Sequence, residues 1–298
     1  MKILLLGAHG QLGNELKKFL PELGELTALS RKDLDLTNLS DLKFKLNSLK
    51  PEIIINASAY TAVDKAETEI DLATLINARV PEILAQYSAE NSAILVHYST
   101  DYVFDGKQKT PYIETDEPNP LSVYGLSKLQ GEQKILETNC KHLIFRTSWL
   151  FSAYGENFMN TIIRLAHERE KLEIISDQWG SPTSCIFLAE ITIQALKLSL
   201  EETGISKSTV WGIYNATSSG VTNWFDFACL IVSKIKTKSE SLKIDLKKIY
   251  PIKTEDYYQK AVRPRYSCLS TSKLETVFSI PIMGYEYYLA NEINKIAL

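Results

Sequence analysis

The first thirteen residues constrain the fold of this chain more than any other stretch. An apolar run over residues 2–6 leads directly into Gly7-x-x-Gly10-x-x-Gly13, and a helical repeat of leucines follows. Glycine at such a turn permits a tight bend, close approach of the backbone to a pyrophosphate, and close packing of helix on strand. The helix N-terminus adds unpaired N–H groups and the positive end of a dipole. The spacing has one residue more than the Gly-x-Gly-x-x-Gly fingerprint, but its strand-to-helix context predicts a dinucleotide site.

Apolar runs continue to alternate with helical patterns as far as residue 177. This alternation predicts an α/β fold, a Rossmann-type doubly wound parallel sheet with a smaller C-terminal substrate-binding lobe. Further strands are expected near residues 26–30, 51–56, 94–100, 142–149 and 172–177, and helices near 38–49, 69–90, 124–132 and 157–170. We expect a dinucleotide-binding domain over 1–178, joined by a late strand near 211–216 after a linker near 204–209, and a mainly substrate-binding lobe over 179–298.

Composition excludes several classes of protein. The chain has 298 residues, 45% hydrophobic and 23% charged, with a net charge of −3 and no Lys/Arg block, so we expect no nucleic-acid surface. The apolar run before Gly7 is too short for a signal peptide or a membrane span, which predicts a cytoplasmic protein. Cys140, Cys185, Cys229 and Cys268 are widely separated, which is typical of reduced core thiols, and the scattered histidines predict no metal site.

Polar residues follow several of the expected strands at the point where each strand ends. Small and polar residues begin at Asn56, hydroxyls and a carboxylate follow at Ser99, Thr100 and Asp101, and Trp149 stands at the exit of the fifth strand. Ligands of open α/β sheets bind at the carboxyl ends of the strands. We therefore expect one site at this edge of the sheet.

The end of the second strand bears on the choice of coenzyme. Ser30 and Arg31 stand where an acidic residue would bind the ribose 2′-hydroxyl of NAD. An arginine can pair with a 2′-phosphate, which favours NADPH over NADH, although Arg31 equally suits a solvated loop. Asp35 and Leu36 lie where the adenine would rest, and Asp35 suits a turn or capping role just as well.

Tyr124 and Lys128 are four residues apart on a predicted helix, so their side chains leave the same face. A nearby ammonium favours the phenolate and lowers the tyrosine pKa from about 10 toward the range in which a phenol exchanges protons with a carbonyl or an alcohol. The pair alone also occurs on solvated helices, so its meaning depends on the dinucleotide signal.

Three strings together resemble the extended short-chain dehydrogenase/reductases: the glycine motif, residues 99–106, and Tyr124-x-x-x-Lys128. Residues 56–67, 146–149 and 177–183 are similar to one family among them, the dTDP-4-dehydrorhamnose reductases, and the resemblance covers nearly the whole chain. It implies NAD(P)H-dependent reduction of the C4 keto group of dTDP-4-dehydro-6-deoxy-L-mannose, the last step of dTDP-L-rhamnose synthesis.

The resemblance also implies roles for individual residues. Tyr124 would give a proton to the C4 carbonyl oxygen, Lys128 would bind the nicotinamide ribose and lower the tyrosine pKa, and Thr100 would hydrogen-bond the reacting oxygen. The other implied coenzyme contacts are Gly10, Gln11 and Leu12 at the pyrophosphate, Asp35 and Leu36 at the adenine, and Ala59, Tyr60, Thr61 and Tyr98 along the rest. The implied substrate contacts are Thr100, Asp101 and Trp149, with Val63 and Tyr102 nearby, although both aromatic residues also suit a core.

Two further groups of charged residues are candidates for ligand contacts. Arg263 and Arg265 could pair with the diphosphate of a sugar nucleotide, or form a surface basic pair. By resemblance, Glu15, Glu190 and Glu292 could hold Mg²⁺ between the subunits of a homodimer, although solvated glutamate is the default on a helix.

Two alternatives stay open at this point. One is a nucleotide-sugar dehydratase or epimerase of the same family, although Tyr102 stands where a dehydratase has a glutamate. The other is a non-catalytic relative of the regulatory subunit of methionine adenosyltransferase, against which the set of Thr100, Tyr124 and Lys128 argues. In the leading interpretation the partner is a small nucleotide sugar, with no nucleic acid or membrane.

Overall fold

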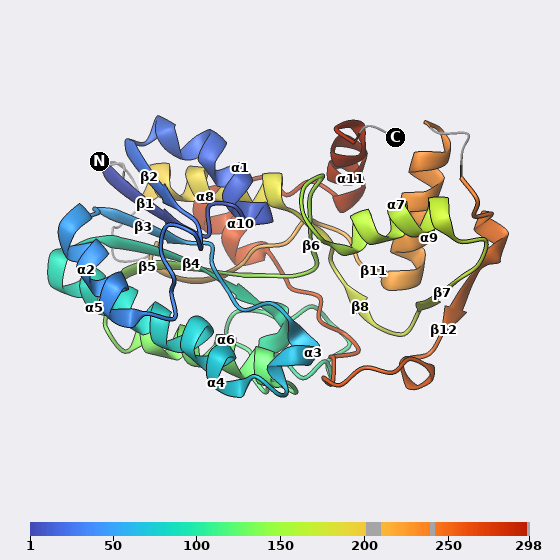
Figure 1. The fold of residues 1–298 in the computed structure, drawn as a ribbon, viewed down its shortest axis with the longest axis horizontal. Coiled ribbons are helices and arrows are strands. Elements are labelled where there is room, and N and C mark those ends of the chain that lie inside the picture. The colour runs from blue at the N-terminus through green and yellow to red at the C-terminus, as the bar shows by residue number, and fades with distance from the viewer. Residues whose placement is uncertain (201–209, 239–241, 297–298) are drawn as a thin grey trace.

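A computed structural model describes residues 1–200, 210–238 and 242–296. Two lobes lie side by side, a sheet lobe with helices on both faces and a smaller lobe that carries the last helix (Figure 1). The linker expected near residues 204–209 lies outside the described residues.

The sheet lobe is built on six parallel strands. They are β1 (Lys2–Leu6), β2 (Glu25–Leu29), β3 (Ile53–Asn56), β4 (Ile94–Thr100), β5 (Lys141–Thr147) and β10 (Gly212–Asn215), in the spatial order β10-β5-β4-β3-β1-β2. The central strands are continuous apolar runs because helices cover both of their faces. The strand order reverses between β1 and β3, and this is where a doubly wound sheet opens a crevice for a ligand.

Helices form a layer on each face of the sheet (Figure 1). Successive residues of a strand point to opposite faces, so Ile3 and Leu5 join one core, whereas Leu4 and Leu6 join the other. The first layer holds α1 (Gln11–Phe19), α8 (Cys185–Leu200) and α10 (Ser272–Phe278), with η1 (Leu20–Glu22) after α1. The second layer holds α2 (Leu39–Leu49), α5 (Val80–Asn91) and α6 (Val123–Leu136), with α3 (Val63–Ala66), α4 (Ile70–Thr74) and the π turn η2 (Leu75–Arg79) before α5.

Side-chain caps fix where several helices begin. Asn38 accepts a hydrogen bond from the Asp41 N–H at the start of α2. Ser122 caps α6 in the same way by accepting from the Gly125 N–H. This cap fixes the first turn of α6, which carries Tyr124.

The smaller lobe consists of short elements from distant parts of the chain. Its helices are α7 (Phe158–Glu168), α9 (Trp224–Lys236) and α11 (Tyr285–Asn294). Three strand pairs accompany them: β6 (Leu150–Phe151) with β9 (Thr183–Ser184), β8 (Trp179–Gly180) with β11 (Thr222–Asn223), and β7 (Leu172–Ile175) with β12 (Ile249–Ile252). The remaining single turns are η3 (Asp101–Val103), which follows β4, and η4 (Leu246–Lys248) and η5 (Thr254–Asp256), which flank β12.

One expectation about the elements is wrong. The run near 172–177 does not supply the sixth strand of the sheet, because β7 pairs with β12 in the smaller lobe, and the late strand β10 takes that place beside β5. A short apolar run after a helix has the same pattern whichever partner it finds. The helical stretch expected over 69–90 is confirmed, because α4, the π-helical segment η2 and α5 follow one another without a break over 70–91. The division of the chain at residue 178 stays a prediction.

The described residues contain no helix that is both long enough and apolar enough to cross a membrane. All four cysteines are free thiols, and three of them are buried.

Candidate active site

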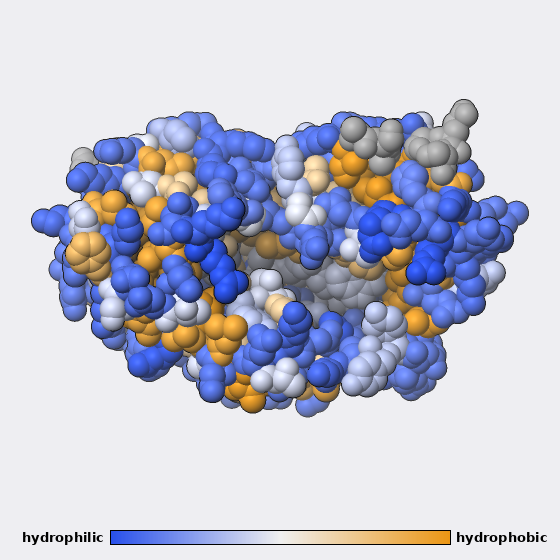
Figure 2. All heavy atoms as spheres, in the orientation of Figure 1, coloured by the Kyte–Doolittle hydropathy of each residue, from blue (hydrophilic) through white to orange (hydrophobic). Residues whose placement is uncertain are grey.

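A cleft of about 1120 Å³ lies at the carboxyl ends of the sheet strands, and residues of both lobes line it. Figure 2 shows it as a hollow in the middle of that face of the molecule. Pockets for drug-sized ligands measure roughly 300–1,000 Å³, so this cleft lies above the usual range for a single such ligand.

The glycine loop forms the coenzyme side of the cleft and has no space for side chains. Gly7 has φ +81°, and a Cβ built there would lie 2.7 Å from the Ala57 carbonyl carbon. A Cβ on Gly13 would lie 2.1 Å from the Gly7 carbonyl oxygen. The loop therefore brings bare backbone and the N-terminus of α1 to the cleft, and this cradle fits a pyrophosphate.

The structure brings the predicted coenzyme residues together, with one exception. Gly13 lies behind the loop and acts through packing. The predicted coenzyme residues that line the cleft are Gly7, Gly10, Gln11, Leu12, Ser30, Arg31, Asp35, Leu36, Ala59, Tyr60, Thr61, Tyr98, Tyr124 and Lys128. The Tyr98 hydroxyl is hydrogen-bonded to Thr192 of α8 at 2.8 Å and is already engaged there.

A carboxylate that the sequence analysis assigned no role shapes the end of β2. Asp33 accepts hydrogen bonds from the Ser30 N–H at 2.8 Å and from the Ser30 hydroxyl at 2.6 Å, and these bonds lower the pKa of its carboxyl. Arg31 is exposed beside it. Asp35 accepts a hydrogen bond from the Thr37 N–H at 3.0 Å, so its carboxylate has the turn role that was one of its two expected roles.

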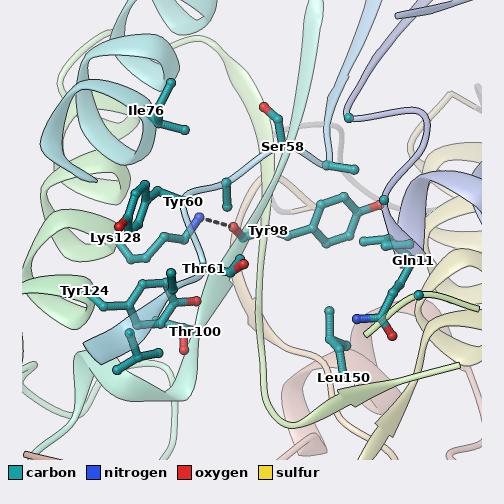
Figure 3. Close-up of a pocket in the computed structure, with 18 of the residues that line it drawn as sticks. Gln11, Ser58, Tyr60, Thr61, Ile76, Tyr98, Thr100, Tyr124, Lys128 and Leu150 are labelled. Carbon is teal, nitrogen blue, oxygen red and sulfur yellow. Dashed lines mark hydrogen bonds between the residues drawn. The ribbon is translucent and has the colours of Figure 1, made fainter. Parts of the chain in front are cut away.

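Tyr124, Lys128 and Thr100 meet at the inner end of the cleft (Figure 3). Thr100 ends β4, and its hydroxyl oxygen accepts a hydrogen bond from the Tyr102 N–H at 3.1 Å. Lys128 is 1% exposed, and its Nζ donates to the Tyr98 carbonyl oxygen at 2.5 Å. These three side chains can supply a proton, a hydroxyl dipole and an amine at one point.

The expected effect of Lys128 on the phenol is wrong for this structure. Burial raises the pKa of Tyr124 to about 12; a hydrogen bond with Thr100 opposes the rise and the charge of Asp101 adds to it. Burial also lowers the pKa of Lys128 to about 8, against the effect of Glu132. Desolvation thus outweighs charge pairing, because the Lys128 amine is directed at the Tyr98 carbonyl.

The substrate side of the cleft begins with a buried carboxyl. Asp101 is 2% exposed, and its Oδ1 accepts a hydrogen bond from the Thr100 hydroxyl at 3.0 Å. Burial raises the pKa of Asp101 to about 7, although hydrogen bonds with Ser267 and Thr100 oppose the rise. Within the described part of the chain its Oδ2 has no hydrogen-bond partner. Asp101 can therefore carry a proton near neutral pH.

Aromatic side chains form the opposite wall. Trp149 has φ +47° and stacks on Trp224, with ring centroids 3.4 Å apart. Gly180 packs against the same ring, because a Cβ there would lie 2.5 Å from Trp149 Cε2. Val63 and Tyr102 line the cleft as expected, and the Tyr102 ring meets the Tyr124 ring edge-on. Trp224 was not predicted, because the smaller lobe carries no motif that distinguishes it from a core tryptophan.

The two arginines lie outside the described lining of the cleft. Arg263 is half-buried, and its Nη2 donates to Asp64 at 2.9 Å. Gln259 also binds the Arg263 guanidinium. Arg265 is exposed. Arg263 therefore ties the smaller lobe to α3 in this structure.

The three glutamates also lie away from the cleft. Glu15 pairs with Lys18 at 2.7 Å and Glu292 with Lys295 at 3.3 Å, and both carboxylates are buried. Burial raises the pKa of Glu190, and the charge of Glu15 adds to that effect. No group of three or more His, Cys, Asp or Glu side chains in the described residues is arranged to hold a metal ion.

A buried ion pair behind the site also had no predicted role. Glu132 of α6 accepts a hydrogen bond from the Arg146 Nη2 at 2.7 Å and another from the Ser99 hydroxyl. Both charged side chains are at most 3% exposed. The pair joins α6 to β4 and β5, so it fixes the height of Lys128 above the sheet. An arginine within an apolar strand was the one signal that could have revealed it.

Known proteins match this chain over nearly its full length. The family profile described as "RmlD substrate binding domain" matches residues 1–298. The dTDP-4-dehydrorhamnose reductase of Escherichia coli K12 is 40% identical over 300 residues, covering 99% of this chain and 98% of that one. Crystal structures of dTDP-4-dehydrorhamnose reductases from Clostridium acetobutylicum and from Bacillus anthracis, the latter in complex with NADP, have TM-scores of 0.90 and 0.88. Each is 36% identical and covers 99% of both chains.

Proposed function

The chain belongs to the dTDP-4-dehydrorhamnose reductase family, and from this premise we propose how its residues reduce the C4 keto group of dTDP-4-dehydro-6-deoxy-L-mannose to give dTDP-L-rhamnose. The observation that supports the proposal most strongly is that the glycine loop and the set of Thr100, Tyr124 and Lys128 border one cleft.

The chemistry divides between the coenzyme and the chain. Bound NADPH or NADH supplies a hydride to the C4 carbon of the sugar. Tyr124 donates its proton to the C4 oxygen, so the carbonyl becomes an alcohol and the tyrosine is left to recover a proton. Thr100 hydrogen-bonds the same oxygen and stabilises the negative charge that develops on it. Because burial raises the pKa of Tyr124 to about 12, the phenol stays protonated until the substrate arrives.

Lys128 serves the coenzyme in this proposal. Its amine lies within the cleft wall next to Tyr124, where it can bind the nicotinamide ribose hydroxyls. Trp149, Tyr102 and Val63 border the space left for the sugar nucleotide. Asp101 can form a hydrogen bond with a sugar hydroxyl there.

NADPH is the proposed coenzyme. The relative from Bacillus anthracis was crystallised in complex with NADP, and the exposed Arg31 stands at the end of β2 where a 2′-phosphate would lie. Asp33 acts in the opposite direction, because a carboxylate beside a 2′-phosphate repels it. We expect a preference for NADPH that Arg31→Ala reduces and Asp33→Asn increases.

Magnesium, a homodimer and a cytoplasmic location remain secondary proposals. The buried Glu15 Oε1 has no partner among the described residues, which suits a cation ligand, but Lys18 and Lys295 already pair with Glu15 and Glu292. Bound Mg²⁺ would have to displace both lysines. Molecular mass in solution, measured with Mg²⁺ and with EDTA, tests both the ion and the dimer.

A coupled assay tests the proposed reaction. The 4-keto sugar nucleotide is generated in place, NADPH and NADH are offered separately, and absorbance at about 340 nm is followed together with the sugar product. The proposal expects one coenzyme to be oxidised for each dTDP-L-rhamnose formed. A dehydratase or epimerase would return its coenzyme unchanged, and a non-catalytic subunit would oxidise none, so either result would contradict the proposal.

A further inference from the structure

A buried histidine that the proposed reaction does not use lies beside the lysine of the site. His97 is on β4, 1% exposed, with its ring between Asn56 of β3 and Lys128 of α6. The Asn56 Nδ2 lies 3.1 Å from Nδ1, and the Lys128 Nζ lies 3.3 Å from Nε2. Both ring nitrogens therefore have specific partners, and those partners decide where the ring carries its proton.

The hydrogen bonds of Asn56 determine the tautomer of His97. The Ser58 N–H donates to the Asn56 Oδ1 at 3.3 Å, and the Ser58 hydroxyl donates to it at 2.5 Å. A backbone N–H only donates, so the amide oxygen faces Ser58 and the amide nitrogen faces His97. That nitrogen also only donates, which makes Nδ1 the acceptor. Because burial holds the pKa of His97 well below its usual value, the ring is neutral and its one proton is on Nε2.

The Nε2–H of His97 consequently points at the Lys128 nitrogen. An ammonium group has three donors and no acceptor, whereas an uncharged amine has a lone pair that can accept this N–H. The Lys128 Nζ also donates to the Tyr98 carbonyl oxygen at 2.5 Å, a bond that either form can make. The histidine contact is thus the one that distinguishes the two forms, and it favours the amine.

We propose that His97 is a positioning residue whose Nε2–H, oriented by Ser58 and Asn56, biases Lys128 toward the uncharged amine. Lys128 is then a group that gains and loses a proton close to neutral pH instead of a permanent cation. The inference rests on the proposed function only in that Lys128 binds the coenzyme. Its consequence is that affinity for NADPH falls as pH rises through the pKa of Lys128, about 8.

Other titratable groups surround Lys128, and the test leaves them unchanged. Two of them, Glu132 and Tyr124, are on α6, and the charge of Glu132 favours the ammonium form of Lys128. Arg146 of β5 pairs with Glu132, and Asp101 lies directly after β4. The π turn η2 contributes the uncharged amide of Asn77, which donates to Ser127 of α6, while its exposed Arg79 pairs with Glu82.

The test measures the dissociation constant of NADPH, by the fluorescence of the bound coenzyme, from about pH 6 to pH 10. In the unchanged protein, affinity should fall with a midpoint near pH 8, and in Lys128→Arg, which stays charged, this fall should disappear. Asn56→Asp places a carboxylate opposite Nδ1, so the ring proton moves to Nδ1 and Nε2 accepts from the ammonium. We expect the midpoint to rise by roughly one pH unit.

His97→Leu distinguishes the effect of the His97 tautomer on the midpoint from the direct effect of the new carboxylate's charge. Alone, it removes the opposing N–H and should raise the midpoint by about half a unit. In the His97→Leu background, the further shift caused by Asn56→Asp should fall below half of its value in the unchanged protein. His142→Gln, which replaces another buried histidine on the neighbouring strand β5, should leave the midpoint in place.

The outcomes decide the inference in either direction. A midpoint that does not move in Asn56→Asp, or a shift of the same size with and without His97, would overturn it, as would an equal shift in His142→Gln. If Asn56→Asp fails to fold, His97→Leu carries the test alone, and an unmoved midpoint there is contradictory. None of these measurements uses the sugar nucleotide, so failure of the reductase proposal would appear separately in the coupled assay.

Discussion

The two sides of the cleft are built in different ways. The coenzyme side is mainly backbone, contributed by β1, the glycine loop and the ends of β2 and β3, all within the first fifth of the chain. The substrate side is mainly side chains, brought together from η3, from the exit of β5 and from α9. A backbone cradle is encoded locally by glycines, whereas a side-chain wall exists only after distant segments pack.

The two sides also differ in their electrostatics. Asp33 on the coenzyme side is exposed, and hydrogen bonds from Ser30 lower the pKa of its carboxyl. Asp101 on the substrate side is buried, and desolvation raises the pKa of its carboxyl to about 7. Asp33, next to the coenzyme side, and Asp101, on the substrate side, thus favour opposite protonation states.

Gly13→Ala should have the largest effect, and on the coenzyme side only. The new Cβ would lie 2.1 Å from the Gly7 carbonyl oxygen, so the loop must open. Overpacking of this kind costs about 1–3 kcal/mol or more, and we expect affinity for NADPH to fall roughly a hundredfold in a fluorescence titration. Gly284→Ala, at φ −65° and against the flexible end of Glu286, is the control and should bind normally. Unchanged affinity in Gly13→Ala would mean that the loop is not the cradle.

Asp101→Asn should show its effect in a different quantity, the stability of the fold as a function of pH. The folded-state pKa of about 7 lies above the ordinary 3.8, so the folded form binds the proton more tightly and loses stability as pH rises from about 4 to 7. Asparagine removes this loss, which is on the order of 4 kcal/mol at most. Thermal unfolding should therefore be measured at pH 5 and pH 8, and the stability of the variant relative to the parent protein should be higher at pH 8 than at pH 5.

Asp33→Asn should behave in the opposite way in the same melting experiment. Its pKa is lowered in the folded state, so the parent protein has the stabilising contribution above about pH 4 and loses it as pH falls. The variant should be less stable than the parent protein at pH 8, and the difference should shrink in acid. Equal signs for the two aspartates would remove the electrostatic contrast between the two sides.

Gly180→Ala should have a moderate effect confined to the substrate side. A Cβ there would lie 2.5 Å from the Trp149 ring and displace the stacked tryptophans. We expect KM for the sugar nucleotide to rise about tenfold, equivalent to about 1.4 kcal/mol, while affinity for NADPH stays unchanged. A matching loss of NADPH affinity would show that the two sides are coupled.

Asp64→Asn should have the smallest effect. It removes the charge that pairs with Arg263 at 2.9 Å, but an asparagine oxygen can still accept from the backbone N–H groups of Lys260 and Ala261. The pair is partly exposed, so we expect a loss of less than about 1 kcal/mol in thermal unfolding. A much larger loss would mean that this contact holds the two lobes together.

The same contrast explains what the sequence predicted. The glycine loop, Thr100 and the Tyr124–Lys128 spacing are local patterns, and each lies in the cleft. Trp224 and the strand β7 depend on which distant segment they meet, and no local pattern carries that information.

The sequence also could not reveal burial. The spacing correctly predicted that Lys128 lies near Tyr124. It could not reveal the burial that raises the pKa of Tyr124, or the hydrogen bond that the Lys128 amine donates to the Tyr98 carbonyl oxygen. His97 and Asn56 are 41 residues apart, so their contact exists only in the folded sheet.

Turnover of Tyr124→Phe, measured together with its affinity for NADPH, decides whether Tyr124 is the proton donor. Phenylalanine keeps the ring but lacks the hydroxyl that donates the proton. We expect turnover of the 4-keto sugar nucleotide to fall by about 10²–10⁴-fold while NADPH binds within roughly threefold of the parent protein. Turnover that stays at the level of the parent protein would contradict the assignment of Tyr124 as the proton donor.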